Sequence, residues 1–314
     1  YQSIKGFNIQ SKSSDPVPYA QELADNPYGG SWASGGTLNT TRAELAGTVG
    51  TQTAAMATGR STPAPTTINE QYNGSSWTEV GDLNTGRGRA AAAATSYTAS
   101  IVFGGVNNPG DTTQAITEKW NGTSWTEVND LPAATCDMAG LGTQTSAFCV
   151  GGTRTAASNL VYSWDGTNWT AGTAINTARQ YLAASGTTPA ALVFGGRNGP
   201  SPGAMMANNE SWNGSSWTEV TDLNTARFQL SGFGTSTSSL ALGGGTPSST
   251  AKTESWNGTS WTEVNDLASA ASFQTAAAGA SNSSGLAVNG TTSQEWAFSG
   301  LPPSTPAADY SDSI

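Results

Sequence analysis

The 314-residue chain contains no histidine, and this absence excludes several kinds of chemistry at once. Without an imidazole there is no histidine base, no histidine metal ligand and no Ser-His-Asp or Cys-His nucleophile. Acid–base, metal or covalent catalysis would have to rely on other side chains. The composition therefore argues against an enzyme, and we expect neither a cofactor nor a metal site.

Charged residues are scarce, at 11% of the chain against about 25% in an ordinary soluble protein. Twelve Lys and Arg face 22 Asp and Glu, which gives a net charge of −10. So few cations suit a phosphate backbone poorly, and we expect no nucleic-acid partner. No run approaches about 18 apolar residues, so we also expect no membrane span.

The chain begins Tyr1-Gln-Ser-Ile-Lys5, without an initiator Met or the pattern of a signal peptide. We interpret it as either a processed protein or a portion of a longer product. There are only two cysteines, Cys136 and Cys149. Two buried thiols and a cross-strand disulfide both remain open, whereas a metal site on two cysteines alone is the weakest reading.

A repeat dominates what the sequence does contain. A tryptophan marks each copy, with spacings of 44 to 48 residues, at positions 32, 77, 125, 169, 217 and 261. A short apolar run that ends in Gly-Gly is the second marker, with full copies ending at Gly105, Gly152, Gly196 and Gly244 and degenerate ones at Gly59 and Gly290. The two markers indicate six internal repeats.

Each repeat is predicted to form four short strands. The first follows an arginine, as in Arg227–Phe233, and the second runs into Gly-Gly. The third holds Glu210–Trp212 and the fourth holds Trp217–Val220. Asn-Gly or Asp-Gly between these last two predicts a type I′ hairpin turn. The Gly-Gly pair predicts positive φ angles or a point where a Cβ would clash.

Six such units predict an all-β chain that folds as a six-bladed β-propeller with four antiparallel strands per blade. The chain resembles the kelch-repeat family over residues 32 to about 298, because Gly-Gly, the aromatic residue before the turn, the Trp after it and the opening arginine recur in register. The arginine is present at Arg42, Arg87, Arg179 and Arg227, and is replaced by Thr135 and Ala271. A WD40 propeller lacks support, since its Gly-His and Trp-Asp markers are absent.

The ends of the repeat array predict how the ring closes. The last repeat stops after Gln294–Phe298 without its fourth strand, while a spare fourth strand surrounds Trp32. We expect that N-terminal strand to complete the last blade. The predicted organisation is a non-propeller arm over 1–28, the propeller over 29–300 and a tail over 301–314. The arm and the tail are either flexible ends or docking arms for a neighbouring subunit.

Chemically suggestive residues recur in every repeat, which argues against a single catalytic site. Acid pairs in Thr-Glu-Val-x-Asp-Leu are interpreted as surface and turn contacts; they are Glu79/Asp82, Glu127/Asp130, Glu219/Asp222 and Glu263/Asp266. The repeated arginine either forms a cationic ring or, as we favour, ties neighbouring blades together. Asn-Gly sequons such as Asn73 are explained better by turn chemistry than by glycosylation, because one copy uses Asp165.

The loops between Gly-Gly and the third strand vary where the rest repeats. Propeller geometry places all six on one face, and loops on a rigid scaffold are where recognition usually resides. Drift of surface loops would produce the same variation. The candidate binding residues are Arg60, Asn107, Asn108, Asp111, Arg154, Arg197 and Asn198.

The repeats also resemble, in composition, kelch-like structural proteins of marine phages. That resemblance implies a non-enzymatic structural and binding module of a virion or an extracellular fibre. Its partners would be further copies of the chain or other virion or fibre subunits, met through the terminal arms, and a host-surface glycan met through the variable face. The alternatives are a stand-alone extracellular lectin-like propeller and, with least support, an enzyme at the channel mouth.

Overall fold

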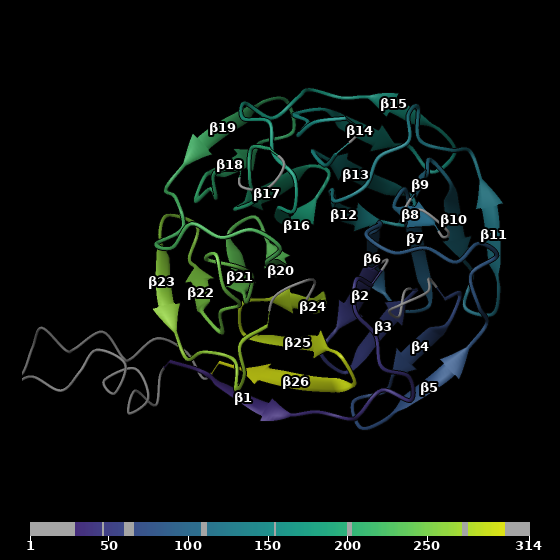
Figure 1. The fold of residues 1–314 in the computed structure, drawn as a ribbon, viewed down its shortest axis with the longest axis horizontal. Helices are drawn as coiled ribbons and strands as arrows, with labels where there is room; N and C mark the ends of the chain where they lie inside the picture. The colour runs from purple at the N-terminus through teal and green to yellow at the C-terminus, as the bar shows by residue number, and fades with distance from the viewer. Residues whose placement is uncertain are drawn as a thin grey trace, which may run out of the picture.

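Six four-stranded sheets are arranged around a central axis in the computed structural model (Figure 1). The structure describes residues 29–45, 47–59, 66–107, 112–153, 155–199, 203–271 and 276–298. Within these ranges the chain forms 26 strands and no helix. All strand pairs in the six sheets are antiparallel, as in β2 with β3. The prediction of an all-β, six-bladed β-propeller is confirmed.

The first five blades each use consecutive chain segments, ordered from the channel outward. Blade 1 contains β2 (Gly47–Thr51), β3 (Ala54–Thr58), β4 (Asn69–Tyr72) and β5 (Trp77–Val80). Blade 2 contains β6 (Ala91–Ser96), β7 (Ala99–Phe103), β10 (Thr117–Trp120) and β11 (Trp125–Val128). Blade 3 contains β12 (Ala139–Thr143), β13 (Ser146–Val150), β14 (Val161–Trp164) and β15 (Trp169–Ala171). Blade 4 contains β16 (Ala183–Thr187), β17 (Ala190–Phe194), β18 (Asn209–Trp212) and β19 (Trp217–Val220). Blade 5 contains β20 (Ser231–Thr235), β21 (Ser238–Leu242), β22 (Thr253–Trp256) and β23 (Trp261–Val264).

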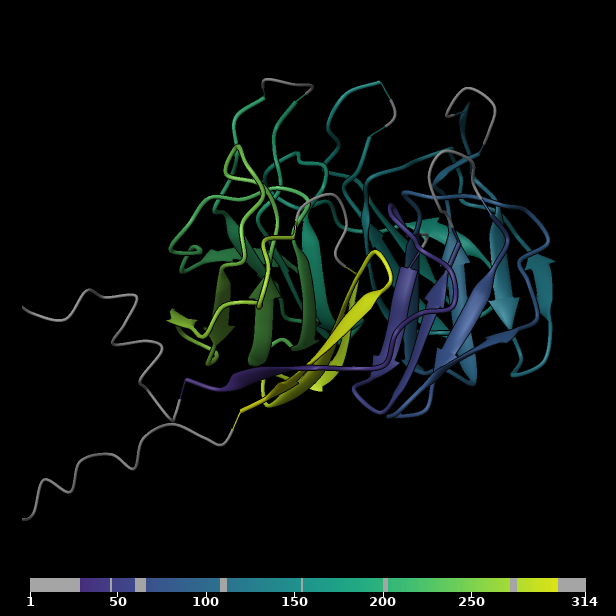
Figure 2. The same ribbon diagram turned by 60° about the horizontal axis from the view of Figure 1, so that its bottom comes forward.

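Blade 6 combines strands from both ends of the described chain. It contains β24 (Ala276–Ser281), β25 (Ser284–Asn289), β26 (Thr292–Ala297) and β1 (Ser31–Ser34). Strand β1 pairs with β26 so that Trp32 lies opposite Trp296, and Figure 2 shows the purple β1 alongside the yellow β26. Without β1 the backbone groups of β26 would form an open sheet edge.

The first strand of each blade begins later than the sequence suggested. Strand β20 starts at Ser231 and not at Arg227, because the intervening residues form a turn in which Gln229 has a φ of +55°. The Gly-Gly prediction is confirmed. Gly195 and Gly196 have φ angles of +65° and +102°, and a Cβ on Gly195 would lie 2.7 Å from a methyl carbon of Leu230.

The predicted type I′ turn between the third and fourth strands is wrong. Such a turn needs positive φ at both central residues, whereas only Gly74 has it in the first copy. The Asn73 side chain instead accepts hydrogen bonds from the backbone N–H groups of Ser75 and Ser76, both at 2.9 Å. Asp165 makes the same pair of bonds in blade 3. Because the side-chain oxygen caps the turn with these hydrogen bonds, the repeat carries Asn or Asp at this position.

Aromatic residues supply much of the core, which is divided into layers between adjacent blades. Two rings pack across the third and fourth strands of every blade, with centroids 5.0 to 5.4 Å apart. Trp32 and Trp296 make this pair in blade 6, although they come from opposite ends of the described chain. Small residues such as Ala91 and Ala147 fill the space between blades 2 and 3. The shortage of large aliphatic residues is therefore compatible with a tightly packed ring.

Four repeated arginines are buried and paired, so the interpretation as a cationic ring is wrong. Arg179 donates to Glu210 Oε1 at 2.7 Å and to the Gly195 carbonyl at 3.2 Å. Asn176 donates two hydrogen bonds to the same carboxylate, from its backbone N–H at 2.7 Å and from its side-chain amide at 2.8 Å. Each arginine lies in the segment that connects two blades and binds a glutamate of the second blade, so the pair ties neighbouring blades together, as we favoured from the sequence. The other three pairs are Arg42–Glu70, Arg87–Glu118 and Arg227–Glu254.

Blades 3 and 6 lack both members of this ion pair. Thr135 and Tyr162 stand in the two positions in blade 3, and both are buried. Ala271 and Gln294 stand there in blade 6, where the Gln294 amide oxygen accepts a hydrogen bond from the Ala268 N–H at 2.9 Å. Losing both charges together avoids leaving one buried charge without a partner, which is the costly arrangement.

Candidate functional site

The structure describes three of the seven residues proposed from the variable loops. Asn107 is half-buried in β8 (Val106–Asn107), which pairs with β9 (Thr112–Thr113) in a loop of blade 2. Asn198 is exposed, and its side-chain oxygen accepts a hydrogen bond from the Ala204 N–H within its own loop. Arg197 lies against neighbouring aromatic rings. The remaining candidates, Arg60, Asn108, Asp111 and Arg154, lie outside the described residues.

The Arg197 guanidinium packs over two aromatic side chains. Its central carbon lies 4.7 Å from the centroid of the Tyr181 ring and 5.0 Å from that of Phe228. The two rings meet edge to face with centroids 6.3 Å apart. Tyr181 and Phe228 come from the turns before β16 and β20, so the loop of blade 4 is joined to the channel side of blades 4 and 5. Cation–π contacts of this kind hold a guanidinium in place without neutralising its charge.

These turns form a ring of backbone hydrogen bonds that we call the αL ring, made by Glu44, Arg89, Asp137, Tyr181 and Gln229. Each residue has a φ between +52° and +58°, in the left-handed region. From Arg89 onward, each N–H donates to the carbonyl of the equivalent residue in the preceding blade, at 2.8 to 3.2 Å, so four such bonds link the five residues. A left-handed conformation is uncommon for residues other than glycine and persists only where the surroundings dictate it.

Backbone pairing on either side explains why the chain turns here. Gln180 and Arg197 exchange two backbone hydrogen bonds, with N···O distances of 3.0 and 2.9 Å. Phe228 and Gly245 make the equivalent bridge in blade 5. Such a bridge holds the residue before the αL position at Arg89, Asp137, Tyr181 and Gln229, and the inner strand holds the residues after it. The αL residue therefore projects toward the channel mouth. The variable loops and the αL ring therefore share one face.

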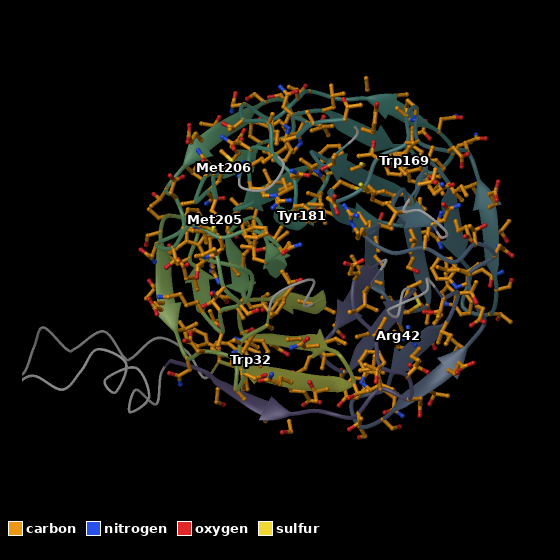
Figure 3. All side chains as sticks on the ribbon, in the orientation of Figure 1. Trp32, Arg42, Trp169, Tyr181, Met205 and Met206 are labelled. Carbon is orange, nitrogen blue, oxygen red and sulfur yellow. The ribbon has the colours of Figure 1, made fainter. Side chains whose placement is uncertain are left out.

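The side chains of the αL ring differ in every described blade, although its backbone repeats. Arg89 forms a bidentate ion pair with Asp137, in which Nε lies 2.7 Å from Oδ1 and Nη2 contacts Oδ2. The same Nη2 donates to the Tyr181 hydroxyl at 3.0 Å. Figure 3 shows Tyr181 at the edge of the channel, whereas Arg42 lies within blade 1. One asymmetric polar cluster thus stands on a nearly symmetric scaffold.

Burial and charge shift the titration of groups around this cluster. Burial, reinforced by the charge of Asp137, raises the pKa of Tyr181 to about 12. Burial likewise raises the pKa of Cys136 to about 12, so its thiol is protonated at neutral pH. The hydrogen bond to Asp137 raises the pKa of Arg89 above its usual range. Neither Cys136 nor Cys149 takes part in a disulfide, so the disulfide alternative is wrong.

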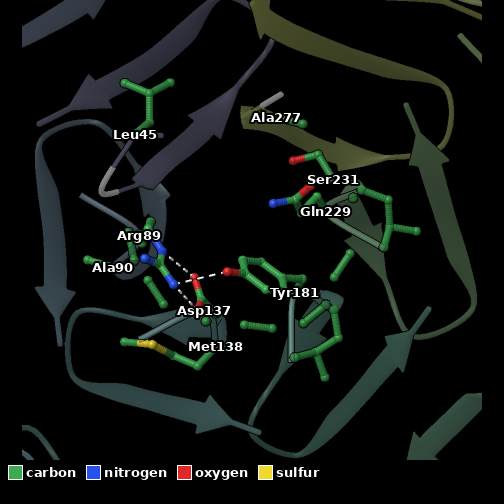
Figure 4. A pocket seen from close by; sticks show the side chains of 18 residues that line it. Leu45, Arg89, Ala90, Asp137, Met138, Tyr181, Gln229, Ser231 and Ala277 are labelled. Atoms are coloured by element: carbon green, nitrogen blue, oxygen red, sulfur yellow. Dashed lines mark hydrogen bonds and ion pairs between the residues drawn. The ribbon is translucent and has the colours of Figure 1, made fainter. Parts of the chain in front are cut away.

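A cavity of about 160 Å³ opens at the centre of the αL ring (Figure 4). Its polar side chains come from Arg89, Asp137, Tyr181, Gln229 and Ser231. The rest of the lining is apolar, from large residues such as Leu182 and Leu230 and from small residues of the inner strands. The side chain of Asp137 is only 1% exposed. Gln229 is 8% exposed, and its buried amide oxygen has no hydrogen-bond partner among the described residues. Buried amide oxygens are normally paired, so this one is an unusual feature of the cavity lining.

The repeated acid pairs form no comparable site. Glu79 and Glu127 are exposed on outer strands. Asp130 accepts a hydrogen bond from the Thr117 N–H at 3.1 Å, and Asp266 accepts one from Thr253 at 3.0 Å. Both aspartates thus accept a hydrogen bond from the first residue of the third strand in their blade. In the described ranges, no three Cys, Asp or Glu side chains gather closely enough to hold a metal ion, and no helix is long and apolar enough to cross a membrane.

Sequence reasoning missed the αL ring because it looked for variation in loops. The relevant signal is a single variable position, two residues after the opening arginine, in an otherwise repeated stretch. Arg87 is followed by Arg89, and Arg179 by Tyr181. Only the closed ring shows that these positions touch, since they are more than 40 residues apart in the chain.

No protein-family model and no curated protein matches this chain.

Proposed function

We propose that this chain is a non-enzymatic structural and binding module of the kelch-repeat type, carried by a virion or an extracellular fibre, and that it recognises its partner through the face of the αL ring. One observation carries the proposal: the ring has a repeated backbone and non-repeated side chains. The buried arginines are engaged by carboxylates of the scaffold, as Arg179 is by Glu210. The ring residues are instead free to differ, which is how recognition surfaces are built on rigid folds.

The composition supports an extracellular or virion setting. The repeats resemble kelch-like structural proteins of phages, and the acidic, lysine-poor surface suits neither nucleic acid nor an anionic membrane. Assembly is assigned to the terminal segments 1–28 and 301–314, which would join further copies of the chain or other virion or fibre subunits. The absence of histidine supports a role without catalysis.

The assembly part of the proposal is tested by comparing the full chain with residues 29–298. Light scattering after size exclusion should show a defined oligomer for the full chain and a monomer for the propeller alone. Electron micrographs of the native assembly, labelled with an antibody against the propeller, should place it on a particle or a fibre. A full chain that remains monomeric and labels no particle or fibre would contradict the proposal.

A stand-alone lectin-like propeller is the second candidate, because the αL ring encloses a small polar cavity. Such cavities accept compact hydroxylated ligands. A glycan array and a sizing column separate the two functions. A monomeric full chain with strong sugar binding favours the lectin, whereas a defined oligomer favours the assembly role.

A further inference from the structure

Gln229 and Arg197 each have a polar group without a hydrogen-bond partner among the described residues. The Gln229 amide oxygen is buried in the cavity lining without a hydrogen-bond partner among the described residues, and Figure 4 shows the side chain directed at the opening. The Arg197 side chain makes no hydrogen bond or ion pair with a described residue, and its Nε is buried. Arg197 does not itself line the cavity; it packs on Tyr181, which does, and on Phe228, the residue next to Gln229.

Arg197 is the charge at the channel mouth that would attract an anion. Every other arginine in the described part of the chain is paired with a carboxylate, including Arg89 with Asp137. Arg197 therefore has no carboxylate partner among the described residues, although the chain carries a net charge of −10 and the ring includes Glu44 and Asp137. A guanidinium held between two rings presents its remaining N–H groups as a preformed fork for a carboxylate.

The cavity selects the rest of the ligand by size and by hydrogen bonding. Its volume of about 160 Å³ is well below the ~300–1,000 Å³ typical of sites for drug-sized ligands, so one sugar-sized ring fits it. The Gln229 oxygen needs a donor, which a ligand hydroxyl supplies. Because the cavity lies at the centre of a closed ring, it can admit the end of a ligand chain. A peptide lying along a sheet edge would not enter it.

We infer that the αL ring binds a terminal acidic sugar residue, whose carboxylate pairs with Arg197 at the rim and whose hydroxyl donates to Gln229 in the cavity. This inference rests on the proposed recognition function and specifies its ligand class. Uronic and sialic acids have the required combination of a carboxylate and neighbouring hydroxyls. Recognition of an acidic peptide is the competing class that the test must exclude.

The test measures binding of glucuronate and N-acetylneuraminate to the full chain by calorimetry, with glucose, acetate and a polyglutamate peptide as comparison probes. We expect both acidic sugars to bind about tenfold or more tightly than glucose, and to bind less tightly as salt rises. Arg197→Gln should weaken acidic-sugar binding by about tenfold or more. Lys252→Gln removes the same charge from the Glu263 pair away from the ring and should leave binding unchanged.

Gln229→Leu separates recognition from folding. It removes an amide with no partner among the described residues, so acidic-sugar affinity should fall while the melting temperature does not. If glucose binds as well as glucuronate, or Arg197→Gln changes nothing, the acidic class is wrong, while binding of glucose still supports a recognition role. Equal binding of polyglutamate would assign the site to acidic peptides and overturn the inference alone. No binding of any probe, together with unaltered partner attachment in Tyr181→Ala, would overturn both the inference and the role of this face.

Discussion

Arg89 and Asp137 occupy the same position in two neighbouring blades, and the guanidinium of one holds the carboxylate of the other, with Nε 2.7 Å from Oδ1. Both residues have left-handed backbones, and the Asp137 N–H donates to the Arg89 carbonyl at 3.1 Å. Side chains and backbone thus join the two blades at the same point. This pairing gives the αL ring its asymmetry.

Replacing Asp137 with Asn should destabilise the protein and loosen the cluster. Arg89 would keep its charge but lose its carboxylate, and its side chain is only 20% exposed. Breaking a buried pair from one side costs about 3–5 kcal/mol, and the partial exposure of Arg89 reduces this to about 2 kcal/mol. Urea denaturation measures the change. An unchanged midpoint would show that the pair does not contribute to stability.

Stability should depend on pH through Tyr181 in alkaline solution. The pKa of its phenol is raised from 10 to about 12, so the folded state favours the protonated form. The stabilising contribution is complete below pH 10 and is lost as pH rises from 10 through about 12. The partial exposure of Tyr181 limits it to about 1 kcal/mol. Unfolding free energies of the wild type and Tyr181→Phe should differ by an amount that falls across this window; parallel curves would contradict the prediction.

Truncation tests the contribution of β1 to blade 6. Removing residues 1–40 deletes the strand that pairs with β26 and the ring of Trp32 that packs on Trp296 at 5.1 Å. Loss of a fully buried Trp costs about 3–5 kcal/mol; Trp32 is partly buried and contributes less, but the hydrogen bonds of β1 with β26 are lost as well, so a large fall in melting temperature is expected. The control ends the deletion at residue 28 and leaves β1 intact. Equal melting of the two truncated proteins would show that β1 does not close the ring.

The buried ion pair between Arg179 and Glu210 in blade 4 can be replaced by the uncharged residues that occupy the same two positions in blade 3. Arg179→Thr alone leaves the Glu210 carboxylate buried without its cation and should cost about 3–5 kcal/mol. Adding Glu210→Tyr reproduces the Thr135 and Tyr162 combination and should recover much of that loss. A double-mutant cycle by urea denaturation measures the coupling. Additive effects would show that the two positions are independent.

The hairpin turns should tolerate Asp but not Ala at the repeated Asn. Asn213 accepts hydrogen bonds from the N–H groups of Ser215 and Ser216, both at 3.0 Å, and Asp165 does the same in blade 3. Asn213→Ala removes both bonds and should cost about 1 kcal/mol. Asn213→Asp should stay within about 0.5 kcal/mol of the wild type, as thermal unfolding would show. Equal losses in both variants would contradict the capping role.

Much of the fold followed from local patterns. The tryptophan and Gly-Gly periods predicted six units of four strands, because each hairpin is specified by residues a few positions apart. Details of backbone conformation were less accessible. The type I′ turn was wrong because the Asn73 side chain replaces a backbone acceptor, and β20 started late because the turn at Gln229 displaces it. Neither effect has a signal in composition or alternation.

The sequence by itself determined the blade number, the strand order and the residues that repeat, since all of these depend on contacts within about 46 residues. Only the tertiary structure decided that Glu44, Arg89, Asp137, Tyr181 and Gln229 form one ring, because hydrogen bonds between successive blades exist only once the blades stand side by side. It also decided that Arg197 joins them, through aromatic rings from two blades. The scaffold is encoded locally and repeated, whereas the site arises from single variable positions that the closed ring brings together.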